Sequence, residues 1–392
     1  MSCTPALADS PCSLHNIIWE EVSLLVKGFS LLFEPLSFGN YKWQGAFGPS
    51  LRGPQAYSRS SPLPLPSTMA GAVAAAAITA LGGNLCRDEC RGSSYPYCSV
   101  AGTLEEKLCR GARLRGPFYY VEGGGSRVAC MYHTENSLIC IDDSGKAGIV
   151  GVAQLQSVGI ALDSLSRSAL EGYIYTLLSV DLTATAKRVA ERFELPHVKR
   201  YGVLVEVHGE CGTAERVDGA IVVLGGEQRP HRLHVLNSQP LTELLKAVLE
   251  RAGGDCYYWH IATPILLCRD TMPEECREAL GSPRELLEKC LVEKVMGLKP
   301  CPRGRLVPEG GRVRFSAIGL GYSHCSWHQG RWAGGKRKYC AAIMPGWGII
   351  AERVADWESW YVSGVGSYSQ LGWGTIAPLP LDFLESLRCT DE

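Results

Sequence analysis

Apolar runs with strand character alternate with helical patterns along this chain, and this order limits the fold more than any single motif does. An extended apolar run, FSLLFEPLSF, covers residues 29–38, and the alanine-rich run MAGAVAAAAITAL follows from Met69. Further strand patterns cover residues 171–180, 201–208 and 217–224, and a helical pattern covers 182–193. Helices that pack on one face of a sheet in this order are typical of an α+β sandwich.

The order recurs after Pro230. Strand patterns cover residues 232–236, 257–267, 312–318, 339–344 and 347–351, and helical patterns cover 241–251 and 285–296. A chain of 392 residues is also longer than one core usually supports. We therefore expect a second domain of the same kind, although the two halves share no repeated motif.

Composition restricts the class of protein. Hydrophobic residues make up 46% of the chain, which is enough for folding without help, and the formal net charge is −1. Nothing global attracts the chain to nucleic acid, so such a site must be a local patch. No uncharged apolar run is long enough to span a bilayer. The opening residues carry Asp9 and no basic cluster, which argues against a secretory signal, so we expect a cytoplasmic protein.

Seventeen cysteines are many for an intracellular protein. Asparagine and glutamine are scarce, which favours a heat-adapted source, a setting in which intracellular proteins keep disulfides. Residues 84–130 have an irregular pattern that contains Cys86, Cys90, Cys98 and Cys109. Their spacing lacks the close pairs of most zinc sites, so a disulfide-stapled insertion is favoured over a metal site. The pairing itself does not follow from the sequence.

The stretch VSGVGSYSQLGWGTI, residues 362–376, contains Gly364, Gly366, Gly372 and Gly374. Glycine accepts positive φ and close backbone approach, and successive free N–H groups form a concavity that suits phosphate. Tyr368 and Trp373 could offer flat faces for bases. A tight hairpin with a bulge is the structural alternative.

Two further features suggest anion binding. Ser67 and Thr68 follow PLPLP where a helix N-cap belongs, and a helix N-terminus can offer N–H groups to an anion. Residues 299–338 contain nine basic residues and one acidic residue, a formal charge of +8, with interleaved aromatic residues. This composition favours RNA or DNA binding over a merely solvated face. Within it we select Arg331, Trp332, Lys336, Arg337 and Lys338.

Catalytic motifs are missing from the sequence. There is no H-E-x-x-H, G-x-S-x-G or P-loop pattern. His324, Cys325 and His328 are close in sequence and could bind a metal, but we interpret this cluster as incidental. We therefore expect no catalytic residue, no metal and no cofactor.

Three segments together resemble the RAMP superfamily of CRISPR-associated proteins, and within it the third subunit of the Cmr (type III-B) effector complex. FSLLFEPLSFGNY with PLPSTMAGAV resembles the first strand and helix of that family. EGYIYT with VDGAIVVLGGEQR resembles its strand and GGE-R turn, and SGVGSYSQLGWGTI is similar to its glycine-rich loop. The resemblance extends over residues 28–376.

The resemblance implies an α+β fold with two tandem ferredoxin-like (RRM-like) domains. The expected division is an N-terminal extension over 1–25, a first domain over 26–230 with the cysteine-rich insertion at 84–130, and a second domain over 231–392 with the glycine-rich loop. The implied role is non-catalytic: the chain would cap the 5′ handle of crRNA in antiviral defence. It would dock on the large cyclase/polymerase-like subunit and the backbone RAMP subunits, and meet target RNA only indirectly.

The resemblance also implies RNA-binding residues. Matched to the family's motifs, these are Ser67, Thr68, Gly225, Gly226, Arg229, Gly364, Gly366, Gly372 and Gly374. We add Arg52 and Arg59, which lie among small residues between the first strand and the first helix.

Two alternative functions remain open. A metal-independent endoribonuclease of the repeat-processing RAMP type would need an acid or base, commonly a histidine in the first domain. No histidine lies between His15 and His133, so loss of cleavage in His133→Ala would favour the enzyme. A purely structural bridge between subunits, with no RNA contact over 299–376, is the other alternative.

Overall fold

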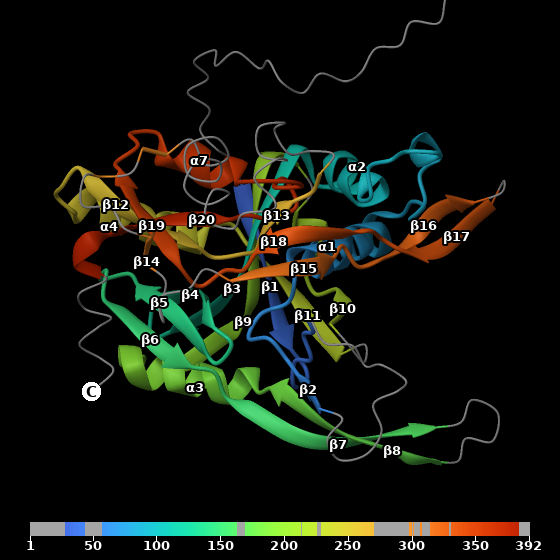
Figure 1. Ribbon diagram of the computed structural model, residues 1–392. Coiled ribbons are helices and arrows are strands. Elements are labelled where there is room, and N and C mark those ends of the chain that lie inside the picture. Colours follow the sequence, from blue (N-terminus) through green and yellow to red (C-terminus); the bar gives the residue numbers. More distant parts are fainter. Residues whose placement is uncertain are drawn as a thin grey trace, which may run out of the picture.

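A computed structural model describes residues 28–43, 57–162, 169–212, 214–225, 229–269, 298–299, 301, 306–307, 314–328 and 331–383. A large antiparallel sheet lies at its centre (Figure 1). Its strands are β1 (Gly28–Pro35), β3 (Cys109–Gly123), β4 (Ser126–Thr134), β5 (Ser137–Asp142), β6 (Ala147–Gly151), β9 (Val198–Cys211), β10 (Ile221–Leu224) and β11 (Arg229–Leu236). They are hydrogen-bonded in the order β10-β11-β1-β9-β3-β4-β5-β6.

Both faces of the central sheet are buried, which explains the nearly continuous apolar sequence of β1. Side chains alternate between the faces of a strand, so Leu31 and Phe33 enter one core and Leu32 enters the other. The first core includes residues of helices α1 (Pro66–Leu81), α2 (Cys98–Lys107) and α3 (Leu182–Phe193). The second core includes helix α4 (Pro240–Arg251) and the strands that follow it.

Two smaller sheets are formed by later parts of the chain, and together they contribute residues to both cores. Their strands are β12 (Cys256–Ile261), β13 (Ile265–Leu267), β14 (Leu306–Val307), β15 (Phe315–Gly319), β18 (Tyr339–Ile343), β19 (Gly348–Glu352) and β20 (Ile376–Pro380). One sheet has the order β14-β19-β12-β20, and the other has the order β13-β18-β15. Helix α7 (Trp357–Ser363) precedes the glycine-rich segment, which leads into β20.

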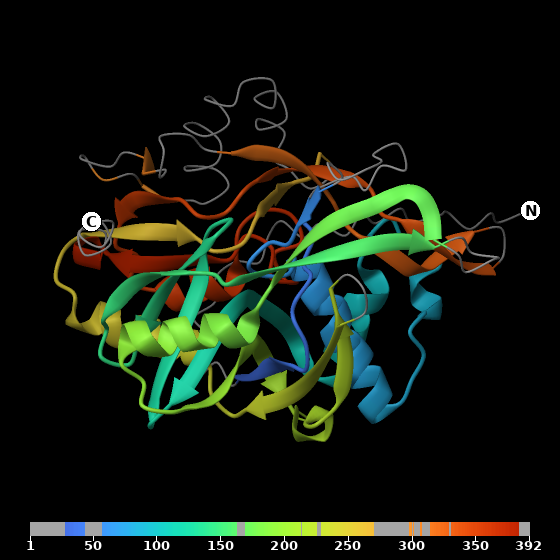
Figure 2. The same cartoon turned by 90° about the horizontal axis from the view of Figure 1, so that it is seen from below.

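Two arms extend from this body (Figures 1 and 2). In one, β2 (Tyr57–Arg59) pairs in parallel with β8 (Ala169–Val180), which pairs with β7 (Gln154–Leu162). In the other, β16 (Tyr322–His328) and β17 (Arg331–Lys336) form a hairpin beside α1 and α2. Among the helices that the structure describes, none is long and apolar enough to cross a membrane.

The expected mixture of helices and antiparallel sheets is confirmed. Strands β11-β1-β9-β3 have the order fourth, first, third, second that a ferredoxin-like sheet shows. However, α3 lies before β9, and between β9 and β11 the described elements are the short helix η2 (Ala214–Val217) and β10. Two tandem ferredoxin-like domains therefore stay a prediction. The expected boundary at residue 230 falls inside β11, which pairs with β1.

The expectation of an irregular segment over residues 84–130 is wrong. This range contains the short helix η1 (Asp88–Cys90), α2, all of β3 and the start of β4. Glycines and Pro117 interrupt the apolar pattern of β3, and its pairing with β9 shifts register three times, after Arg110, Arg115 and Glu122. Such irregularities hide a strand from a period-two search. The helix expected over 285–296 lies outside the described residues.

Twelve of the cysteines form disulfides in the structure. The pairs are Cys86–Cys325, Cys90–Cys98, Cys109–Cys211, Cys130–Cys140, Cys256–Cys301 and Cys268–Cys340. The disulfide interpretation of the four cysteines at 86–109 is confirmed, although two of them pair with partners far outside that segment. Since Cys325 is also paired, it does not join His324 and His328 in a metal site.

Candidate nucleic-acid interface

A cleft lies between helix α1, the loop before α2 and the end of the β16–β17 hairpin. We call its two parts the helix chamber and the loop chamber. The helix chamber has a volume of about 330 Å³ and is lined by Ser67, Thr68, Gly71, Ala72, Ala75, Leu85, Ser99, Val100, Val223, Gly321, Ser323, Cys325 and Arg337. The loop chamber has about 420 Å³ and is lined by Cys90, Gly92, Ser93, Ser94, Tyr95, Pro96, Cys98, Ser99, Ser323, Cys325, Arg337 and Lys338.

Ser67 and Thr68 lie in the first turn of α1 and line the helix chamber. The prediction that they form the N-cap is wrong. The N-cap is Leu65, which has no side-chain cap, and Pro66 occupies the first helical position. Proline is favoured there because its missing N–H would have no partner inside the helix. The two hydroxyls therefore face the cleft from within the helix.

Arg337 stands between the chambers, directly after β17. Its backbone N–H donates to Gly321 O at 2.9 Å, and its Nη1 donates to Leu320 O at 3.3 Å. The guanidinium lies 4.5 Å from the centre of the Tyr97 ring. A Cβ added to Gly321 would lie 3.7 Å from Arg337 Nη1 and 3.9 Å from Ser67 Oγ. Both are ordinary contact distances, so it is the positive φ of Gly321, +85°, that favours glycine at this position.

The cleft is cationic and rich in hydroxyls. Arg337 and Lys338 line it, and no carboxylate is among the described residues that do so. Burial lowers the pKa of Arg337, while the neighbouring Tyr97 and Tyr95 act in the opposite direction. A guanidinium stays protonated in proteins, so it can bind phosphate oxygens.

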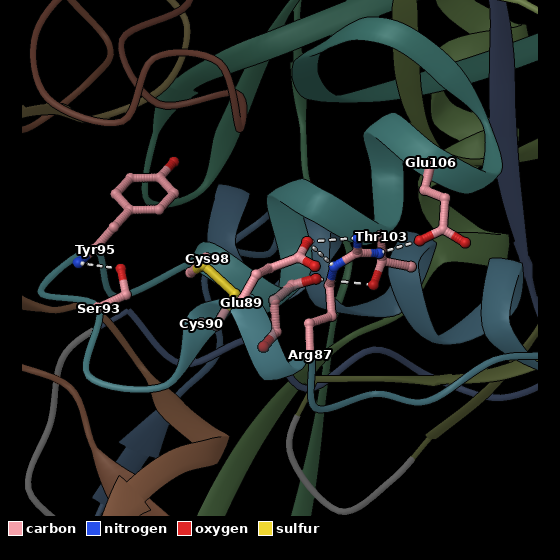
Figure 3. Close-up of a disulfide and its surroundings, with 9 residues drawn as sticks. Arg87, Glu89, Cys90, Ser93, Tyr95, Cys98, Thr103 and Glu106 are labelled. Carbon is pink, nitrogen blue, oxygen red and sulfur yellow. Dashed lines mark hydrogen bonds and ion pairs between the residues drawn. A yellow bond between two sulfur atoms is a disulfide. The ribbon is translucent and has the colours of Figure 1, made fainter. Parts of the chain in front are cut away.

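Two disulfides hold the walls of the cleft. Cys86–Cys325 ties the hairpin to the segment after α1, and Cys90–Cys98 closes the loop that carries Ser93, Ser94 and Tyr95 (Figure 3). Arg87 forms ion pairs with Glu89 and Glu106 beside this loop (Figure 3). Covalent and ionic links therefore hold these walls in addition to the apolar core into which α1 and α2 pack.

The glycine-rich segment is packed into the interior rather than opened to solvent. Tyr368 and Trp373 are 5% and 0% exposed, so the expectation that they offer free faces to bases is wrong. A Cβ on Gly374 would lie 1.7 Å from Val365 O, and one on Gly372, where φ is +91°, would lie 2.7 Å from Gly116 O. These glycines are needed for close backbone packing. RNA contact by Gly364 and by the exposed Gly366 stays a prediction.

The turn after β10 packs on the residues that follow β1. Gly225 has φ +76°, and a Cβ there would lie 2.5 Å from Asn40 O. The Arg229 guanidinium lies 4.0 Å from the centre of the Phe38 ring. Val223, two residues before Gly225, lines the helix chamber, so this turn adjoins the cleft.

Several predicted residues are only partly placed. Gly226 and Arg52 lie outside the described residues, and the side chains of Arg59, Arg331 and Lys336 are not described. Trp332 lies opposite Trp327 in the hairpin. Their proposed RNA contacts stay predictions.

Sequence reasoning missed most of the cleft. Ser93, Ser94 and Tyr95 carry a local signal, because hydroxyl groups are concentrated in SSYPY between Cys90 and Cys98. Ser99, Val223 and Ser323 give no such signal. They reach the cleft only through the tertiary fold.

The chain is similar to known proteins only at low sequence identity. No protein-family model and no curated protein matches the chain. One similar solved structure is a chain of the cryo-EM structure of type III-B Cmr-beta bound to cognate target RNA and AMPPnP, state 1. It has 16% identity and a TM-score of 0.47, and the match covers 88% of this chain and 95% of that chain. A second, from Cmr-beta bound to cognate target RNA, has 16% identity and a TM-score of 0.45, covering 88% and 96%. Similarity at this level does not by itself assign a function.

Proposed function

We propose that this chain is a non-catalytic RNA-binding subunit of a type III-B CRISPR ribonucleoprotein effector. In this role it caps the 5′ handle of crRNA and docks on the large cyclase/polymerase-like subunit and the backbone RAMP subunits. The proposal rests on the motif resemblance and on one structural observation. Ser67 and Thr68, selected from one motif, and Arg337 and Lys338, selected from charge, lie in the same cleft.

The chemistry of the cleft suits a single-stranded RNA backbone. Cations neutralise phosphates, and hydroxyl groups donate hydrogen bonds to phosphate oxygens. The flanking chambers leave room for sugars and bases on either side of Arg337.

Turnover is not part of the proposal. The described residues that line the cleft contain no histidine. His133, the residue whose substitution tests the nuclease alternative, lies in β4 and is 7% exposed. A general acid or base must reach the atom whose proton it transfers.

The test is the salt dependence of RNA binding by the full chain. Lys338 is exposed, so Lys338→Glu should leave the fold intact. With a single-stranded RNA of the handle sequence, this variant should bind more weakly. The slope of log affinity against log salt should become shallower by about 0.7, the value expected for one lost phosphate contact on a single strand.

Lys187→Glu is the matched control, since Lys187 is exposed on α3 and does not line the cleft. Equal slopes for wild type, Lys338→Glu and the control would contradict the proposal. Purification of the native particle, followed by sequencing of the 5′ ends of its small RNAs, tests the handle assignment. Absence of repeat-derived 5′ ends would contradict that part.

A further inference from the structure

The two chambers meet at a narrow set of shared residues, which we call the neck: Ser99, Ser323, Cys325 and Arg337. The neck joins three segments that are far apart in sequence. Ser99 belongs to α2, Ser323 and Cys325 belong to β16, and Arg337 follows β17. Both chambers are lined by these four residues.

The hydroxyl of Ser99 is buried and makes no hydrogen bond within the described part of the chain. The residue is 8% exposed, and its Oγ has no hydrogen-bond partner among the described residues. Its backbone carbonyl accepts from Thr103 Oγ1 at 2.8 Å. Arg337 Nε is likewise buried without a partner in the described part of the chain. Buried polar groups are rarely left unpaired, and each one costs stability.

The two chambers differ in chemistry. Beyond its Ser67–Thr68 rim, the helix chamber is walled by Ala72, Ala75, Leu85 and Val223. The loop chamber offers the hydroxyls of Ser93, Ser94 and Tyr95 together with Lys338. The volume of each lies within the range of small-ligand pockets. An apolar pocket, an anion-binding neck and a polar pocket thus follow one another.

We infer that the cleft binds one unpaired nucleotide of a single strand, with a phosphate at the neck and its base in the helix chamber. The phosphate accepts hydrogen bonds from Ser99 Oγ and from the Arg337 guanidinium. The adjoining sugar-phosphate lies among the hydroxyls of the loop chamber. This inference rests on the proposed function, and it identifies which part of the RNA the cleft holds.

A nucleotide fits this order of surfaces better than other ligands do. A free phosphate would satisfy the neck but leave the apolar wall unused. Apolar ligands would leave Ser99 Oγ and Arg337 Nε buried without partners. A base attached to a phosphate meets both requirements at once. Since the wall beyond the rim has no hydrogen-bonding side chain, the pocket should accept different bases.

Ser99→Ala separates ligand binding from a structural role. Because the hydroxyl is unpaired in the fold, its removal should leave the melting temperature unchanged or slightly higher. Affinity for a short single-stranded RNA labelled at its 3′ end should fall about tenfold, the loss expected for a hydrogen bond to a charged group. Unchanged affinity, or a lower melting temperature with unchanged affinity, would overturn the assignment of the neck.

Ala75→Leu tests the base pocket, since Ala75 is exposed on α1 and lines the helix chamber. The larger side chain should weaken binding of intact RNA about tenfold, comparable to a lost base contact. A set of RNAs with an abasic site at successive positions should include one that wild type and Ala75→Leu bind equally. Thr79→Leu, on the same helix outside the chamber, is the control and should bind as wild type does.

The outcomes separate this inference from the proposed function. If wild type binds no RNA, both are overturned. If wild type binds RNA and neither Ser99→Ala nor Ala75→Leu changes the affinity, RNA lies elsewhere on the chain and only the inference fails. If Ala75→Leu weakens binding equally for every abasic RNA, the base pocket is wrong. If both variants bind RNA normally but lose a protein subunit of the effector, the cleft holds a protein segment instead.

Discussion

At the scale of single residues, Arg115 has the clearest structural role. It lies on β3, is 0% exposed, and donates from Nη1 to Ser369 O at 2.7 Å and from Nη2 to Val362 O. These carbonyls flank the first half of the glycine-rich segment. Burial lowers the pKa of Arg115 to about 9, which reflects how far the guanidinium is removed from water. Arg115 therefore holds the glycine-rich segment in place through hydrogen bonds to its backbone carbonyls.

Arg115→Met should destabilise the fold by about 3 kcal/mol, because the buried carbonyls lose their donor. Chemical denaturation of the variant measures this loss. Arg113→Met, an exposed position on the same strand, is the matched control and should change stability little. Equal stabilities for the two variants would mean that the glycine-rich segment holds its position without Arg115.

Two buried histidines predict a dependence of stability on pH. Burial lowers the pKa of His231 to about 4 and that of His260 to about 3, from an ordinary value of 6.5. Tyr132 O accepts a hydrogen bond from His260 Nε2 at 2.8 Å, and His231 Nε2 lies 3.2 Å from Tyr41 Oη. Below pH 6.5 both rings take up protons in the unfolded chain, whereas in the folded protein they stay neutral. The stability that these two histidines contribute is therefore fully present above pH 6.5 and is lost as the pH falls toward 3–4.

One pH unit below 6.5, each histidine should remove about 1.4 kcal/mol from the free energy of unfolding. Urea denaturation near neutral pH and at moderately acidic pH measures the difference. His260→Gln should flatten the profile in this interval. A wild-type profile that is already flat would show that these rings are protonated in the folded protein.

At the scale of elements, the sequence is informative where local signals agree. The bounds expected for α3, 182–193, are those found, because an apolar stripe is preceded by Asp181, whose carboxylate accepts from Ala184 N at 2.8 Å. Strand β3 was missed because Pro117 and three register shifts break its pattern. The strand expected over 257–267 is divided into β12 and β13, since Pro264 and its neighbours interrupt the pairing.

The candidate site was predictable only in part, for the same reason. Ser67, Thr68, Arg337 and Lys338 carry local signals of motif or charge, and the fold brings them together. Ser99 carries none: a serine becomes notable only when it is buried without a partner. The glycine-rich segment carries a strong signal, yet the same glycines permit tight packing as readily as phosphate binding.

The Cys86–Cys325 disulfide gives a prediction about the hairpin. It links residues 239 positions apart and fixes one wall of the cleft. The double variant Cys86→Ser with Cys325→Ser should lose about 2–5 kcal/mol of stability and bind RNA more weakly at a temperature where it stays folded. The pair Cys256→Ser with Cys301→Ser is the control, since it removes a disulfide outside the cleft. The control variant should lose stability and keep its RNA affinity. If both double variants lose RNA affinity equally, the disulfide at the cleft has no specific role in RNA binding.

At the scale of the whole molecule, a nearly neutral chain forms one cleft whose described lining has two cations and no carboxylate. The central sheet is covered on both faces, so the elements that form the cleft are held by a core shared between the first and later parts of the chain. The proposed function is tested by where RNA lies on this chain more than by how strongly it binds.

Ultraviolet crosslinking of the native particle, followed by mass spectrometry of the peptide–RNA adducts, measures that position directly. We predict crosslinks within residues 90–99 and around Arg337 and Lys338. These crosslinks should diminish in Ser99→Ala and persist in Lys187→Glu. Crosslinks confined to other surfaces, with none in the helix or loop chamber, would contradict the claim that this cleft holds the RNA.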